Sequence, residues 1–136
     1  MKAMLAALVV AGCGGSNAPP KPDSPKHTVQ AFLDYVKKGD WKSACGLLDA
    51  TGKSSVPLRI GVDLNTELDK FGLPKNCPAS LAKHAARLRA AVQGDAPGST
   101  HAVRGAATVS TPHGAWAVAR VPGTADRWQV QALPPP

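Results

Sequence analysis

Aromatic residues are scarce in this 136-residue chain, which has three tryptophans, two phenylalanines and one tyrosine. With so few large side chains, we expect one small core built from leucine, valine and alanine. The short motifs of common enzymes are also absent: there is no Gly-x-Ser-x-Gly, His-Glu-x-x-His, phosphate-binding loop or dinucleotide fingerprint. The sequence therefore predicts no catalytic residue, no cofactor and no metal site.

The apolar segment near the N-terminus is short. Ala3 to Ala11 is nine residues, whereas a transmembrane helix needs about 20, so this segment does not span a membrane. It follows a lysine and precedes small residues, which is typical of a secretory signal. A buried core helix is the alternative, but a segment rich in glycine, serine and proline, residues 14–20, follows at once.

Val10-Ala11-Gly12-Cys13 resembles the lipobox of bacterial lipoproteins. The resemblance implies that residues 1–12 are a signal peptide and that Cys13 becomes a lipidated N-terminus. The lipid on Cys13 would hold the protein on the extracytoplasmic face of the cell membrane. Residues 13–23 carry no large apolar side chain beyond this cysteine, so we expect a disordered tether. A single domain, residues 24–136, would follow it.

The two other cysteines are Cys45 and Cys77. An even number of thiols in an exported domain favours a disulfide. A metal site or a reactive thiol is the alternative. Two cysteines without a nearby His-x-x-His or Cys-x-x-Cys partner make a poor zinc site, so the sequence predicts that Cys45 and Cys77 are bonded to each other.

Acidic residues are few: 9 Asp and Glu stand against 16 Lys and Arg, a formal net charge of +7. Beside a membrane, such a surface would be attracted to anionic lipid head groups or wall polymers. The alternative is a basic surface that only serves solubility. Nucleic acid is not an expected partner, because aromatic and basic residues do not alternate as they do in single-strand binders.

The first half of the domain predicts helices. Ser24 and Pro25 are typical of a helix start, Gly39 of a helix end, and Asp40 of the cap of a second helix over residues 41–48. A third helix is predicted from Cys77 to Gly94, with a further helical segment at 63–71 and a short extended piece at 56–60. The first helix has apolar residues on one face, namely Val29, Phe32, Leu33 and Val36.

From Thr100 the period of the apolar pattern changes to two. Three strands are predicted, over residues 100–110, 115–121 and 127–133, with turns at 111–114 and 122–123. Helices followed by a meander define an α+β class. We expect the N-terminal helices to pack on a curved antiparallel sheet, giving a cone-like domain with an open mouth, and a fourth strand near residues 56–60.

This pattern resembles the nuclear transport factor two-like superfamily, and more narrowly small actinobacterial lipoproteins of that type. The segments that carry the resemblance are residues 27–36 and 38–48, Cys77, and the closing Trp128-Gln129-Val130. The resemblance implies a cone-shaped α+β domain. Enzymes of the superfamily place an aspartate or a His/Asp pair inside the cone, whereas many relatives serve as binding or assembly modules.

Candidate ligand-binding residues follow from this resemblance. Tyr35 of the first helix corresponds to a region from which isomerase-like relatives send a tyrosine into the cavity, although it fits the edge of the core equally. Trp116 and Trp128 are candidates for a pocket lining, or they fill the core as large aromatics usually do.

Three polar residues of the strands are further candidates. His101 opens a strand and would face the cavity as a base, but no carboxylate stands at a matching strand position. Arg104 and Arg120 would share a sheet face and bind an anion, or they belong to a solvated outer face. By contrast, His113 lies in a predicted turn and is expected at the surface.

Two functions remain open from the sequence. The first is a non-enzymatic, membrane-anchored accessory domain that binds a small apolar ligand or a partner protein of the cell envelope. The second is a cavity enzyme of isomerase or dehydratase type that uses His101 or an aspartate. An open pocket with an inward carboxylate or histidine would favour the enzyme, and a filled cone would favour binding.

Overall fold

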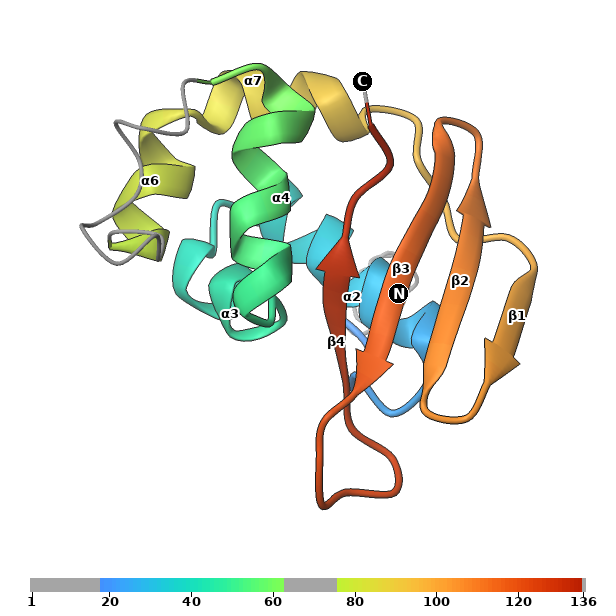
Figure 1. Cartoon of the computed structure of the whole chain (residues 1–136). Helices are drawn as coiled ribbons and strands as arrows, with labels where there is room; N and C mark the ends of the chain where they lie inside the picture. The colour runs from blue at the N-terminus through green and yellow to red at the C-terminus, as the bar shows by residue number, and fades with distance from the viewer. Residues whose placement is uncertain (1–17, 63–75, 136) are drawn as a thin grey trace, which may run out of the picture.

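The computed structural model describes residues 18–62 and 76–135. Within them, five helices precede a four-stranded antiparallel sheet, so the predicted α+β class is confirmed (Figure 1). The strands run in the order β1-β2-β3-β4 and the sheet is open. The helices are α2 (Pro25–Lys38), α3 (Trp41–Gly46), α4 (Ala50–Ile60), α6 (Cys77–Lys83) and α7 (Ala85–Val92), and the strands are β1 (Thr100–Val103), β2 (Ala106–Thr111), β3 (Gly114–Arg120) and β4 (Trp128–Ala132).

Helix α2 begins and ends as the sequence predicts. The side chain of Ser24 accepts a hydrogen bond from the backbone N–H of His27. Pro25 has no backbone N–H, so the first position of the helix leaves no donor without an acceptor. Gly39 closes the helix at φ 79°, in the left-handed region that favours glycine. These caps are local interactions, so the sequence alone predicts where α2 begins and ends.

The second helix is shorter than predicted. Asp40 caps α3 through the backbone N–H of Ser43, but the helix ends at Gly46. The next residues leave it to pair with β4: Val130 N–H donates to the Leu47 carbonyl, and Asp49 N–H donates to the Val130 carbonyl. Two hydrogen bonds to the edge of the sheet thus replace the last helical turn.

The extended segment predicted at residues 56–60 is wrong, because these residues form the C-terminal half of α4. Asp49 caps this helix by accepting from Gly52 N–H at 2.7 Å. Val56 and Pro57 are buried, and Arg59 donates to the Ala91 carbonyl of α7 at 2.7 Å. Packing outweighs the helix-breaking tendency of the internal proline. The helix predicted at 63–71 lies outside the described residues.

The third predicted helix is divided into α6 and α7. The chain turns at His84, where φ is −106° and ψ is 24°. The two pieces have different neighbours, since α6 packs on α3 while α7 packs on α2 and α4. A disulfide joins Cys45 of α3 to Cys77 of α6, so the predicted pairing is confirmed.

The sheet has one strand more than the meander predicted. Residues 100–110 form β1 and β2, joined by a tight turn whose two central residues both have positive φ, 46° at Arg104 and 76° at Gly105. Such values define a hairpin turn that suits the twist of antiparallel strands. The strand that the meander prediction lacked is therefore β1, the first strand in the chain, and no strand forms at residues 56–60.

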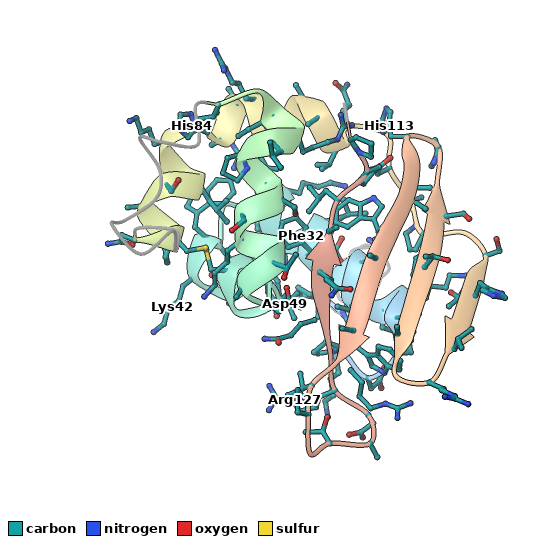
Figure 2. The ribbon with its side chains drawn as sticks, viewed as in Figure 1. Phe32, Lys42, Asp49, His84, His113 and Arg127 are labelled. Carbon is teal, nitrogen blue, oxygen red and sulfur yellow. A yellow bond between two sulfur atoms is a disulfide. The ribbon has the colours of Figure 1, made fainter. Side chains whose placement is uncertain are left out.

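One face of the sheet packs on α2 and the other is open (Figure 1). Phe32 meets Trp116 edge to face, with ring centroids 5.7 Å apart. Figure 2 shows Phe32 between the helices and the strands. The space between α2 and the sheet is therefore filled, and the fully buried sheet residues facing it are Val109, Trp116, Val118 and Val130.

Candidate functional site

A groove of about 650 Å³ lies between α2 and α7. Its floor is apolar, because both helices turn short or aliphatic side chains toward each other. The size lies within the range of small-molecule sites, which combine apolar walls with a few convergent polar groups. The apolar lining residues are Leu33, Val36, Ala86, Ala90 and Val92, and the polar ones include Gln30, Asp34, Lys37, Arg89, Gln93 and Asp95.

Hydrogen bonds hold several of the polar side chains of the rim. Gln30 Nε2 donates to Asp34 Oδ1 at 2.8 Å, one turn along α2. Arg89 Nε donates to the Val36 carbonyl at 3.1 Å, and its guanidinium lies 5.2 Å from the centre of the Trp41 ring. A cation at this place complements the C-terminal end of α2. The groove therefore has a fixed basic group on one side and a carboxylate on the other.

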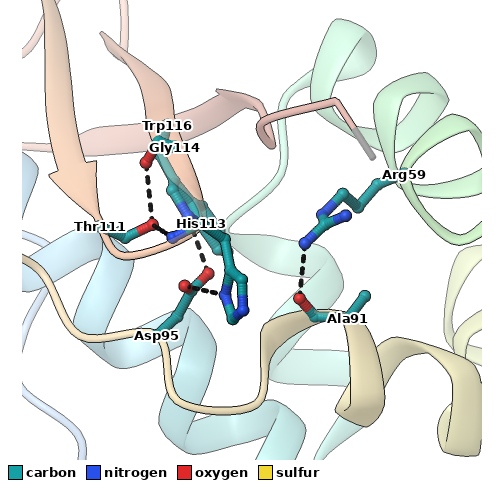
Figure 3. Close-up of polar contacts among 7 residues, drawn as sticks. All are labelled: Arg59, Ala91, Asp95, Thr111, His113, Gly114 and Trp116. Atoms are coloured by element: carbon teal, nitrogen blue, oxygen red, sulfur yellow. Dashed lines mark hydrogen bonds and ion pairs between the residues drawn. The ribbon is translucent and has the colours of Figure 1, made fainter.

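One end of the groove contains a buried carboxylate. The Asp95 side chain is only 1% exposed and accepts hydrogen bonds from His113 Nδ1 at 2.5 Å and Trp116 Nε1 at 3.3 Å (Figure 3). His113 is fixed by the hairpin, because Thr111 Oγ1 accepts its backbone N–H. Asp95 thereby ties the segment after α7 to the β2–β3 turn.

The imidazole of His113 is oriented rather than loose. Its Nδ1 faces the carboxylate, so Nε2 is the nitrogen left for other partners, and the side chain is 40% exposed. A carboxylate behind a histidine is the arrangement that positions a general base. The expected surface position of His113 in a turn is confirmed, but this pairing was not predicted.

The aromatic candidates do not line the groove. Trp116 is fully buried and Trp128 is almost so, and both belong to the core. Tyr35 is half-buried and packs against the same core. Because the chain has few aromatic side chains, its large ones are needed to fill the core and do not line the groove.

The polar candidates are spread over the sheet. His101 pairs with Thr108 on β2, which places it on the open face rather than toward α2. Arg104 lies in the β1–β2 turn, not on a strand as predicted. Arg120 places its guanidinium 5.0 Å from the centre of the Trp128 ring. Only the two arginines come near each other, because Arg120 N–H donates to the Gly105 carbonyl.

The sequence pattern indicates neither the role of Asp95 nor the groove. Asp95 lies 18 residues before its partner His113, and no spacing rule connects a residue after a helix with a residue in a hairpin. The groove residues share only an ordinary amphipathic pattern. Among the residues that the structure describes, no group of three His, Cys, Asp or Glu side chains is placed to hold a metal ion.

No protein-family model, curated protein or solved structure matches this chain.

Proposed function

We propose that this protein is a lipoprotein anchored by Cys13 on the extracytoplasmic face of the cell membrane. The sequence Val10-Ala11-Gly12-Cys13 carries the proposal, and it lies outside the described residues. The Cys45–Cys77 disulfide supports an oxidising compartment. In residues 18–62 and 76–135, no helix has the length and apolar character to cross a membrane.

Fractionation and intact mass test the anchor. In a bacterium that processes lipoproteins, the chain is expected in the membrane fraction, with a mass that starts at Cys13 and includes a diacylglycerol. Cys13→Ala should lack this added mass and leave the membrane fraction, whereas the neighbouring control Ser16→Ala should retain both. A lipid-bearing, membrane-bound Cys13→Ala protein would contradict the proposal.

The domain itself is proposed to bind a small apolar ligand without catalysis. The observation that carries this proposal is the groove between α2 and α7, with its aliphatic floor and hydrogen-bonded rim. The filled space between α2 and the sheet supports binding over catalysis inside a cone. The likeness to nuclear transport factor two-like domains remains a prediction that rests on the sequence motifs alone.

Filling the groove tests ligand binding. Ala90→Trp places an indole on the floor, and we expect it to weaken binding of the fluorescent apolar probe 1-anilinonaphthalene-8-sulfonate at least about tenfold, or roughly 1.4 kcal/mol. Ala82→Trp, at an exposed position of α6 outside the groove, is the matched control and should leave the affinity unchanged. Equal affinity in both variants would place the probe elsewhere.

The oriented Asp95–His113 pair favours one alternative, a cavity enzyme of isomerase or dehydratase type. Native mass spectrometry of the purified chain separates the two functions. A molecule retained unchanged by both the wild type and His113→Gln supports binding alone. A molecule that is converted by the wild type but retained unconverted by His113→Gln supports the enzyme.

A further inference from the structure

Three segments from distant parts of the chain meet at one end of the sheet. They are residues 18–24 before α2, the β1–β2 turn 103–106 and the β3–β4 loop 121–127, which we call the entry end (Figure 1). Backbone hydrogen bonds connect them: Trp128 N–H donates to the Pro22 carbonyl at 3.0 Å, and Arg120 N–H to the Gly105 carbonyl at 2.8 Å. The segment that leads toward Cys13 thus leaves the domain at this end.

The entry end is basic. Three exposed cations lie in it, Lys21, Arg104 and Arg127, and the exposed Arg120 adjoins it as the last residue of β3. Within the described residues, none of the four makes an ion pair. Two carboxylates also belong to this end, Asp23, whose Oδ1 lies 2.7 Å from His27 Nδ1, and the exposed Asp126. The cations therefore outnumber the carboxylates by four to two.

The opposite end of the sheet has a different charge. The segment after α7, residues 93–99, and the β2–β3 turn, residues 111–114, contain no lysine or arginine, and their one carboxylate is the buried Asp95. Strand β3 runs from this end at Gly114 to the entry end at Arg120, about 20 Å at the usual rise per residue. The positive charge of the sheet is therefore concentrated at the entry end of the strands.

The short chain between Cys13 and the domain also favours the entry end as the part of the domain nearest the membrane. Pro22 lies nine residues after Cys13, a distance of about 30 Å even in a fully extended chain. If Cys13 carries lipid, as the proposed function states, the entry end is held next to the head groups. Basic side chains that approach an anionic membrane within about 8–10 Å are attracted to it at physiological salt.

We propose that the entry end docks on the anionic lipid head groups of the membrane that holds Cys13. The sheet then stands on the membrane on its β1–β2 turn and β3–β4 loop, and Asp95 and His113 point away from it. The inference rests on the proposed anchor for its orientation, but lipid recognition by the four cations is a property of the folded domain and is measured without the anchor.

Vesicle co-sedimentation tests the docking. The full chain with Cys13→Ser carries no lipid, and its partition is compared between phosphatidylcholine vesicles and vesicles with 30 mol% phosphatidylglycerol. The partition coefficient is expected to be larger for the vesicles with phosphatidylglycerol. The excess over the phosphatidylcholine value should vanish in 0.5 M NaCl. Arg104→Gln and Arg127→Gln should each reduce the excess about fivefold, because each removes one cation near the surface.

Lys42→Gln is the matched control. Lys42 is an exposed lysine of α3 that lies well away from Arg127 (Figure 2), and its loss should leave the excess nearly unchanged. The proposal is overturned if Lys42→Gln reduces binding as much as the arginine variants, which would indicate net charge alone. The proposal is also overturned if the protein binds both vesicle types equally. That result would be expected if the entry end binds a wall polymer or a protein in place of lipid. Failure of the anchor would instead appear in the mass of the wild-type chain.

Discussion

Replacing Gly52 with alanine is expected to destabilise the fold by about 3 kcal/mol or more, as for overpacking against groups that cannot move aside. A Cβ atom at position 52 would lie 2.1 Å from the Val130 carbonyl oxygen and 3.1 Å from its carbon. That carbonyl also accepts the Asp49 N–H that joins α4 to the sheet. The free energy of unfolding, measured by urea denaturation, gives the effect.

The control is Gly46→Ala at the end of α3, where no atom beyond the neighbouring residues and the helix's own backbone lies within 4 Å of the added Cβ. Alanine in a helix is usually better than glycine by up to about 1 kcal/mol, so this variant should be as stable as the wild type or more so. The same substitution thus has opposite expected signs at the two positions. A Gly52→Ala protein with the wild-type midpoint would show that α4 does not approach β4 so closely.

Removing the disulfide with Cys45→Ala and Cys77→Ala is expected to cost about 4 kcal/mol, from the chain-entropy model for cysteines 32 residues apart. The cost is large beside the 5–15 kcal/mol that usually stabilises a domain. We expect the urea midpoint to fall accordingly. The loss should be most evident at α6, which packs on α3 beside the disulfide.

Reduction supplies the comparison for this variant. Dithiothreitol should lower the midpoint of the wild type to nearly that of the double variant and leave the double variant unchanged. A wild-type midpoint that is unaffected by complete reduction would mean that the bond contributes nothing to stability. Thiol titration of the denatured protein, before and after reduction, verifies that Cys45 and Cys77 are bonded.

Local signals explain which parts of the fold were predictable. Ser24, Gly39 and Asp40 act within one helical turn, so the sequence places α2 and the start of α3 correctly. The segment around Pro57 misled the prediction, because its helical state depends on packing against β4 and α7. The β1–β2 turn was missed because the alternation of side chains continues through it and Arg104 adopts a conformation that few non-glycine residues do.

The candidate site was less predictable, because it arises only when separate elements pack. The groove forms from residues of two helices about 50 positions apart, and Asp95 in the α7–β1 connection contacts His113 in the β2–β3 turn. The predicted tryptophans instead became core residues. An amphipathic pattern identifies the buried face of a helix but does not reveal which two exposed edges will lie side by side.

The pairing of Leu47 and Asp49 with Val130 has a consequence for crowding. It closes the β4 side of the sheet, where Ser55 also accepts the Leu133 N–H. The other side is β1, four residues long and preceded by Pro97. Short edge strands resist the edge-to-edge pairing that leads to aggregation. If Cys13 holds the protein on a membrane, as proposed, its copies would meet often in two dimensions, and this sheet would offer them little backbone to extend.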